Sequence, residues 1–489
     1  MALRRKRADE QQVLFVPYTA TRSPGHPFYE KLNGLLREAQ FDRFAEERCA
    51  PYYADGVGRP GIAPGVYFRM LLTGYFEGID SQRGIAWRCA DSKSLAEYLG
   101  MRPDEATPDH SSLTRIRQRL PLEVHEAIFE RILSIAREKG LLKGKTIAVD
   151  STTLEANAAM KSIVRKDSGE DWKEYVTRLA KEAGIEEATD EELRRFDRKR
   201  RGKKCSNDDW RSPSDPDARI AKMKNGDTHL AYKAEHAVDL DTEMIVAAEV
   251  YHADESDAET LAATLGAAQV NLTEAGAERA VEEAVADKGY HASEALVECA
   301  ESDVRTYIPE RKTDRRTWTD KPAEQREAVY ANRRRCRGER GKKLQRLRSE
   351  RVERSFAHVC ETGGARRSWI RGLLEVSKRY LMQVAGHNLG ILMRKLFGIG
   401  TPRSLQGSLR ALLRLFESLA ELVRAHMTYF DDLRQWILPG PSRLAAGRLP
   451  AAAQKTAFVN GLLGRSLSAS FTVGNLSLPY WSKTPATGG

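Results

Sequence analysis

The chain has 489 residues, of which 41% are hydrophobic and 30% charged, and it carries a formal net charge of +10. This length predicts two to four domains, and the apolar content is sufficient for packed cores. The basic balance favours a polyanionic partner, nucleic acid in particular, over a protein that is merely basic and soluble. Six cysteines without C-x2-C spacing disfavour a zinc site, and the lack of a long apolar run disfavours a membrane protein. We therefore expect a cytoplasmic protein with reduced thiols.

The N-terminal part of the chain is predicted to be helical. Residues 1–22 are predicted to form a flexible basic arm without the apolar segment of a secretory signal, and residues 23–142 a helical domain. Within this domain apolar residues recur three and four positions apart, and Ser81 is placed to cap a helix. The last short helix carries three arginines, namely Arg115, Arg117 and Arg119. Short helices that end in one displaying arginines indicate a helix-turn-helix DNA-binding module, the alternative being an ordinary helical bundle with solvated arginines.

The central part, residues 143–400, is predicted to be an α/β domain. A short β run ends at Asp150, and a charged helical insertion follows at about 155–225. The order after the insertion is hairpin, helix, strand, helix, strand, helix, with strands expected at 228–240, 243–253, 280–287 and 304–310. This order describes a mixed sheet flanked by helices, as in an RNase H-like fold. The hairpin turn, "DLDTE", lacks glycine.

The chain after residue 311 is densely basic. Its apolar stripe predicts a helix at about 343–359, with a second helix at about 369–396 packed behind it. Residues 401–489 are predicted to hold one further helix, at about 404–437, and a tail of low periodicity. The basic stretch would neutralise DNA phosphates.

Three carboxylates stand out, and each has an alternative role. Asp150 follows the apolar run "TIAV" and could instead cap the next segment, and Asp287 follows "EAVA" and could instead form an Asp-x-Gly turn. Glu353 lies beside the apolar stripe of the basic helix and could instead belong to a lattice of surface charges, with Glu350 as its competitor. Two strand ends and a packed helix could gather all three acids in one pocket. Such oxygen ligands suit Mg²⁺ or Mn²⁺.

Several consecutive motifs of the sequence resemble those of a known family. They include "YFRMLLTGYFEGIDSQRGIAWRCADSKSLAEYLG", "VDSTTLEANA", "AYKAEHAVDLDTEMIVAAEV", "ADKGYHASE" and "RVERSFAHV". Over about residues 25–400 the chain resembles the bacterial insertion-sequence transposases of the DDE class, in the branch with an InsH-like N-terminal domain.

The resemblance implies a catalytic and metal-binding triad of Asp150, Asp287 and Glu353 that holds two Mg²⁺ or Mn²⁺ ions. It implies binding of the terminal inverted repeats, DNA cleavage, joining of 3′ ends to target DNA and a homodimer on double-stranded DNA. It implies no zinc site, no membrane and no small-molecule substrate.

The basic residues around Glu353 depart from the family. Relatives often carry Tyr, Arg and Lys at −7, −4 and +7 from the glutamate, where this chain has Arg346, Ser349 and Cys360. Arg348 is the substitute that we expect for the missing arginine. The residues predicted to contact DNA are Arg115, Arg117, Arg119, Lys288, Arg346, Arg348 and Arg354.

Two other functions remain open from the sequence. The chain could be an RNase H-like nuclease or resolvase that cuts DNA without strand transfer. It could also be a catalytically inactive DNA-binding protein with the same fold. The intact set of three acids argues against the inactive protein, and only analysis of the DNA products separates a nuclease from a transposase.

Overall fold

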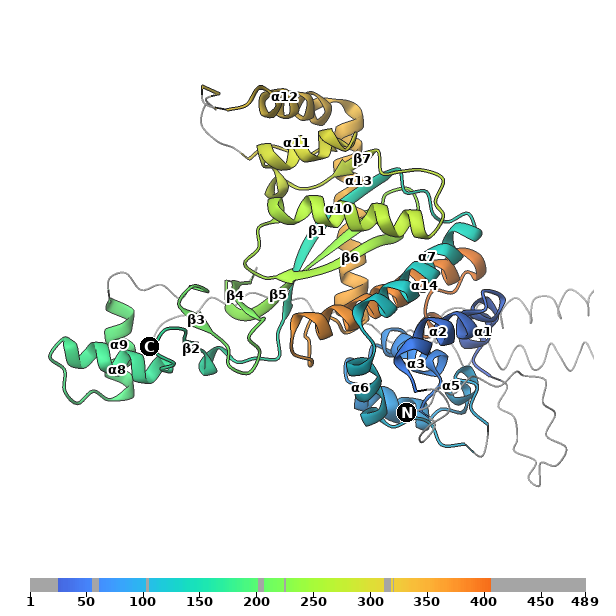
Figure 1. Cartoon of the computed structure of the whole chain (residues 1–489), viewed down its shortest axis with the longest axis horizontal. Coiled ribbons are helices and arrows are strands. Elements are labelled where there is room, and N and C mark those ends of the chain that lie inside the picture. Colours follow the sequence, from blue (N-terminus) through green and yellow to red (C-terminus); the bar gives the residue numbers. More distant parts are fainter. Residues whose placement is uncertain are drawn as a thin grey trace, which may run out of the picture. The chain divides into compact units, whose positions relative to one another are not determined.

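The computed structural model describes residues 25–54, 61–102, 105–200, 206–223, 226–311, 318, 319 and 321–405. All of these residues belong to one compact unit that ends at Leu405 (Figure 1). The predicted basic arm, the predicted helix at 404–437, apart from its first residues, and the tail lie outside the described residues.

The helical character predicted for the N-terminal part is confirmed. The helices are α1 (Pro27–Glu38), α2 (Phe41–Cys49), α3 (Pro64–Glu77), α4 (Gln82–Ala90), α5 (Lys93–Tyr98), α6 (His110–Arg119) and α7 (Leu122–Glu138). Ser81 caps α4 as predicted, because its side chain accepts a hydrogen bond from the backbone of Gly84. The amphipathic helices α1 and α7 turn their apolar stripes inward, whereas α3 is buried on nearly every side. A helix that is apolar all round must be enclosed by other elements.

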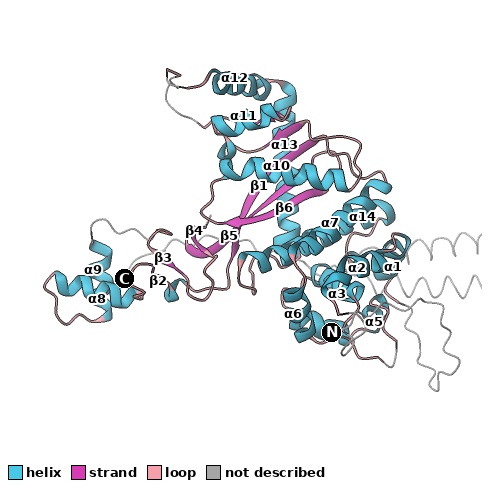
Figure 2. Cartoon of the chain, viewed as in Figure 1, coloured by secondary structure: helices cyan, strands magenta, loops and turns pink. Residues whose placement is uncertain are grey.

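The mixed sheet predicted for the central part is also confirmed (Figure 2). Its six strands are β1 (Thr146–Glu155), β4 (Arg219–Lys222), β5 (Thr228–Asp239), β6 (Ile245–His252), β7 (Glu283–Val285) and β8 (Arg305–Tyr307). Strand β5 lies antiparallel to β1 on one edge and to β4 and β6 on the other. Strands β7 and β8 continue the sheet on the far side of β1 in parallel register.

Helices cover both faces of this sheet. Glu235 on β5 accepts hydrogen bonds from Thr260 and Thr264 of α10 (Asp257–Glu274). Its neighbour His236 contacts Ser355 of α13 (Glu339–Phe356) and Tyr380 of α14 (Leu373–Phe397) instead. Because successive side chains of a strand point to opposite faces, α10 covers one face, and α13 and α14 cover the other. Helices α11 (Ser293–Glu301) and α12 (Ala323–Arg337) lie beside β8.

The hairpin between β5 and β6 turns without glycine. The carboxylate of Asp239 accepts hydrogen bonds from the backbone of Asp241 at 2.9 Å and from the hydroxyl of Thr242 at 2.7 Å. Glu243 then adopts the left-handed conformation, with φ of 70°. An aspartate that binds the backbone two residues onward replaces the usual glycine turn.

The insertion predicted at about 155–225 contains the helices α8 (Trp172–Glu182) and α9 (Asp190–Lys199) and the short strands β2 (Val164–Arg165) and β3 (Trp210–Arg211). The prediction that it is helical up to about residue 225 is wrong, because β4 pairs with β5 in the main sheet. A small core of Val176, Ala180 and Leu193 joins the two helices. Both helices begin with a capping box, which satisfies the first backbone N–H groups of each.

The long helix α14 connects the helical part of the chain to the sheet. It packs against α3 and α7 on one side and against β6 on another, so that most of its side chains are buried. The apolar side chains of α14 are therefore explained by its burial between these elements. None of the described helices is long and apolar enough to cross a membrane. The helix predicted at 343–359 begins earlier, at Glu339, and passes after Phe356 into a π-helical segment at Ala357–Thr362.

Candidate active site

Two of the three predicted acids lie on neighbouring parallel strands. Ala148 of β1 pairs with Val285 of β7. Continuing this register by two residues brings Asp150 opposite Asp287, which caps the short 3-10 helix after β7. The prediction that Asp150 ends its strand is wrong, because antiparallel pairing with β5 extends β1 to Glu155. Because β7 ends at Val285, the middle of β1 has no described strand paired with it on that edge. The two aspartates lie at this gap in the sheet.

Like charges accumulate around Asp150. Its Oδ2 accepts a hydrogen bond from Nη1 of Arg348 at 2.6 Å, and its Oδ1 accepts one from the backbone of Ser151 at 2.9 Å. Burial raises the pKa of Asp150, Arg348 opposes that shift, and the carboxylates of Asp287 and Asp257 add to it. A group of carboxylates that repel one another favours the binding of a cation.

Asp257 is a further acid that the sequence did not single out. It lies in the first turn of α10, where its Oδ1 accepts a hydrogen bond from the hydroxyl of Ser151 at 3.0 Å. Gly289 lies between it and Asp287, and a Cβ there would lie 2.7 Å from a carboxylate oxygen of each, so a larger residue would displace these carboxylates. The capping-box sequence "SDAE" predicts the start of a helix here, but its position beside β1 depends on the tertiary fold.

Glu353 is not brought to the aspartates. It lies on α13 with an exposed side chain, and it makes no side-chain hydrogen bond or ion pair to any described residue. Glu350, its competitor, forms an ion pair with Arg354 at 2.5 Å, as the surface-charge alternative predicted. Within the described ranges, no three Asp, Glu, His or Cys side chains are grouped closely enough to hold a metal ion.

Helix α13 is fixed firmly against the sheet beside Asp150. Gln345 donates hydrogen bonds from its amide to the carbonyls of Ala286 and Tyr307, at 3.0 and 2.5 Å. Further along the helix, Ser355 contacts Nδ1 of His236 at 2.8 Å. His236 is the cross-strand partner of Asp150, and its burial keeps its pKa well below the ordinary value. These contacts hold Arg348 within reach of Asp150.

The donors at this site suit a hard cation. Asp150 and Asp287 supply carboxylate oxygens, and the Mg²⁺ or Mn²⁺ expected from the sequence prefers such ligands. Arg348 occupies one oxygen of Asp150 in this arrangement, so it neutralises part of the charge that a metal ion would neutralise. The two aspartates are the residues that could hold the metal, with Glu353 as the predicted third ligand.

The three arginines predicted for α6 are in three different environments. Arg115 is exposed. Arg117 is only 9% exposed and forms an ion pair with Glu375 of α14 at 2.6 Å, so the prediction that this helix displays it is wrong. The guanidinium of Arg119 lies over the ring of Tyr53, 5.3 Å from its centroid. Packing of α6 against α14 and the preceding helices therefore leaves one of the three on the surface.

The other predicted DNA contacts lie near the carboxylates or on α13. Lys288 and Arg346 are exposed. Arg348 is held by Asp150, and Arg354 is held by Glu243 and Glu350. Contact with DNA stays a prediction for these residues.

Two family models match the chain. The N-terminal match, at residues 18–119, is to a transposase domain of the DUF772 family, and the second, at residues 286–393, is to a transposase DDE domain. The matched segments include Asp287 and Glu353 but not Asp150. No curated protein and no solved structure matches the chain. The two domain matches are those expected of an insertion-sequence transposase of the DDE class.

Proposed function

We propose that this chain, which carries a transposase domain near its N-terminus and a transposase DDE domain toward its C-terminus, cuts and joins DNA as the transposase of an insertion sequence. In this proposal it binds the terminal inverted repeats of the element, cleaves the DNA there and joins the freed 3′ ends to target DNA. Two copies act together on DNA, because two ends have to be joined.

The observation that carries the proposal is the meeting of Asp150 and Asp287 across β1 and β7. The sheet around them supports an RNase H-like fold, since the antiparallel strands β1, β4, β5 and β6 are followed in the chain by the parallel strands β7 and β8, with helices between them. In such a sheet, ligands bind beyond the carboxyl ends of the parallel strands. Asp287 lies at that end of β7.

Asp150 and Asp287 would hold Mg²⁺ or Mn²⁺, and Glu353, which lies exposed on α13 apart from the two aspartates, would have to move toward them to complete the set for two ions. When bound, the ions supply charge stabilisation at the phosphodiester and a nucleophile at neutral pH. The protein contributes a rigid sheet that fixes the positions of the two aspartates. Exposed Lys288 and Arg346 would bind phosphates on either side of the scissile bond. Arg348 would keep Asp150 charged and oriented before DNA arrives.

The test is cleavage of duplexes that carry the ends of the element, taken from the inverted repeats that flank the gene. Asp287→Asn should abolish strand cleavage in Mg²⁺ and leave binding of the same duplex unchanged. Asp303→Asn is the matched control, because Asp303 is an exposed aspartate in the turn before β8, where asparagine is also tolerated at its φ of 57°. Full cleavage by Asp287→Asn would overturn the assignment of this site.

The products separate transposition from the alternatives. Covalent joining of a 3′ end to a second duplex supports a transposase. Cleavage without joining indicates a nuclease or resolvase, and DNA that stays intact in both Mg²⁺ and Mn²⁺ indicates an inactive DNA-binding protein.

A further inference from the structure

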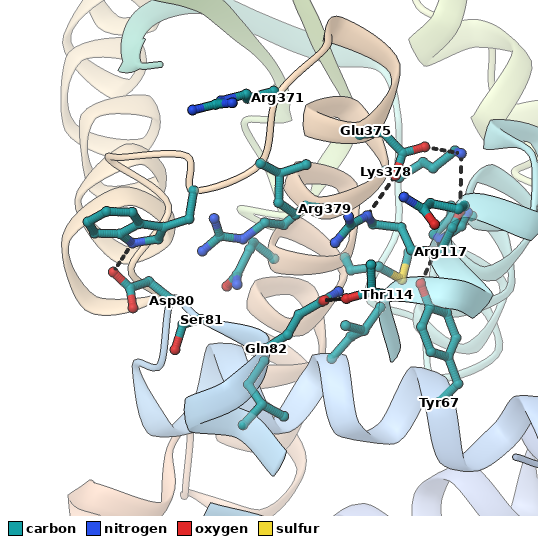
Figure 3. Close-up of a pocket in the computed structure, with 18 of the residues that line it drawn as sticks. Tyr67, Asp80, Ser81, Gln82, Thr114, Arg117, Arg371, Glu375, Lys378 and Arg379 are labelled. Carbon is teal, nitrogen blue, oxygen red and sulfur yellow. Dashed lines mark hydrogen bonds and ion pairs between the residues drawn. The ribbon is translucent and has the colours of Figure 1, made fainter. Parts of the chain in front are cut away.

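A second polar site lies away from the carboxylates. A pocket of about 640 Å³ opens between the N-terminal helices and α14, with the segment that precedes α14 on its rim (Figure 3). Arg379 extends from α14 toward Asp80 in this view, and Arg371 lies above it. A pocket of this size accommodates a small organic molecule or one unit of a polymer.

The lining of the pocket carries more positive than negative charge, since Arg117, Arg371, Lys378 and Arg379 face only the carboxylates of Asp80 and Glu375. The carboxylate of Glu375 forms two ion pairs, one with Arg117 at 2.6 Å and one with Lys378 at 2.7 Å. The other carboxylate of the lining, Asp80, accepts the indole N–H of Trp369 at 2.6 Å.

The remaining cations, Arg371 and Arg379, bind only backbone carbonyls among the described residues: Arg371 that of Asn157 at 3.1 Å, and Arg379 that of Gly364 at 3.4 Å. Burial lowers the pKa of Arg379 to about 10, which Asp80 offsets only in part. A guanidinium in this position favours an anion such as a phosphate.

The wall of the pocket also carries an unused hydrogen-bond acceptor. Gln383 is 4% exposed, and its Oε1 has no hydrogen-bond partner among the described residues. Buried polar atoms are nearly always satisfied, so an unpaired one that lines a pocket points to a ligand that donates an N–H group. The amides of Gln82, Gln118 and Asn157 add further donors and acceptors to the same lining.

An aromatic surface completes the site. The side chain of Trp369 is 47% exposed at the pocket, which is unusual for so large an apolar group. Its indole N–H is fixed by Asp80, and the guanidinium of Arg367 lies 4.7 Å from the centre of its ring. A tryptophan held in one orientation offers a flat face for stacking, with little entropy left to lose on binding.

We propose that this pocket binds one unpaired nucleotide of a DNA strand, with its base against Trp369 and Gln383 and its phosphate between Arg371 and Arg379. The anion site matches the phosphate of a nucleotide, and the aromatic face and the amides match the face and the edge of its base. Asn157 follows Asp150 by seven residues, at most about 23 Å of extended chain, so a strand bound at the carboxylates can reach the pocket. The inference rests on DNA as the substrate in the proposed function, and it does not depend on the metal site.

The test measures the binding of fluorescent duplexes to the full-length protein in EDTA, which removes any contribution of metal ions. One duplex has a single unpaired nucleotide, and the other is fully paired. The wild-type protein should prefer the first, and both Trp369→Leu and Arg379→Gln should reduce that preference by roughly tenfold. Trp87→Leu is the control, because Trp87 is 64% exposed on α4 and does not line the pocket.

Several outcomes would overturn the proposal. One is an unchanged preference in both variants. Another is equal competition by inorganic phosphate and by a deoxynucleoside monophosphate, since that would show an anion site without base recognition. Arg371→Gln, at an exposed position, tests the phosphate contact again if Arg379→Gln does not fold. Binding of both duplexes without preference overturns the pocket alone, whereas no binding of either duplex by the wild-type protein overturns the proposed function as well.

Discussion

The carboxylate site on the sheet and the pocket beside α14 hold unbalanced charge of opposite sign. At the first, Asp257 and Asp287 add negative charge around Asp150, which Arg348 beside Asp150 and Lys233 beside Asp257 compensate only in part. At the second, Arg371 and Arg379 form no ion pair among the described residues, because Glu375 is paired with Arg117 and Lys378, and Asp80 offsets the effect of burial on Arg379 only in part. The first arrangement favours a cation and the second an anion.

The two sites are also built differently. The register of two adjacent strands brings Asp150 and Asp287 together, so their proximity depends on backbone pairing within the sheet. The pocket is lined by residues as far apart in the chain as Asp80 and Arg379, and it exists only because α14 packs against the N-terminal helices. A change on the sheet should therefore affect chemistry first, and a change at α14 should affect stability as well as binding.

The largest expected effect separates the two glutamates of α13. Glu353→Gln should lower DNA cleavage by roughly 10² to 10³-fold, as expected for the loss of a group that stabilises the transition state. Glu350→Gln should have little effect, because its carboxylate is paired with Arg354 on the surface. Rates of cleavage measured with equal amounts of bound DNA check this. Equal losses in the two variants would contradict the choice of Glu353.

A second prediction compares two arginines of α6. Arg117→Gln should lower the free energy of unfolding by about 2–3 kcal/mol, because it leaves Glu375 with only one cation in a half-buried position. Arg115→Gln should leave stability unchanged. If Arg115 contacts a phosphate, the variant should release about one counterion fewer on binding DNA, so the logarithm of its affinity should depend less steeply on the logarithm of the salt concentration. Urea denaturation and binding at several salt concentrations distinguish the two effects. A stable Arg117→Gln variant would contradict the structural role of the buried pair.

Removal of Arg348 should increase the affinity of the carboxylate site for a metal ion. In Arg348→Gln, Asp150 loses its counter-charge, so Mn²⁺ should bind about tenfold more tightly in the absence of DNA. Calorimetric titration of the DNA-free protein measures this directly, and Arg346→Gln is the control because Arg346 is exposed on the same helix. Unchanged or weaker Mn²⁺ binding in Arg348→Gln would show that the arginine does not compete with the metal.

A last prediction concerns pH and the wall of the pocket, and its effect is small per pH unit. Burial lowers the pKa of His125 to about 4 in the folded protein, whereas the unfolded chain has the ordinary value near 6.5. Between these values the unfolded state binds more protons, so stability falls as the pH falls, by up to about 1.4 kcal/mol per pH unit. In thermal melting, His125→Gln should lose less stability than the wild-type protein as the pH falls from 6.5 to 4. Identical slopes would mean that His125 is not buried in its neutral form.

The sequence by itself determined the main helices and the hairpin, but not the strands β2, β3 and β4, and it singled out two aspartates that the sheet brings together. Alternation and turn residues predicted the hairpin, and helical periodicity predicted α13 and α14, because these signals depend on neighbours along the chain. The aspartates after "TIAV" and "EAVA" were predicted as candidates for the same reason. The end of β1 was misplaced, since its last residues are held by β5 across the sheet rather than by any apolar run of their own.

The tertiary structure alone decided which charged side chains face one another. Arg115 and Arg117 are two residues apart on one helix, yet Glu375 buries the second and leaves the first exposed. Asp257 joins the carboxylates because α10 begins beside β1, and Asp80 binds the indole of Trp369 while it only partly offsets the effect of burial on Arg379. A sequence states which charges are present, but their compensation depends on contacts between segments far apart in the chain.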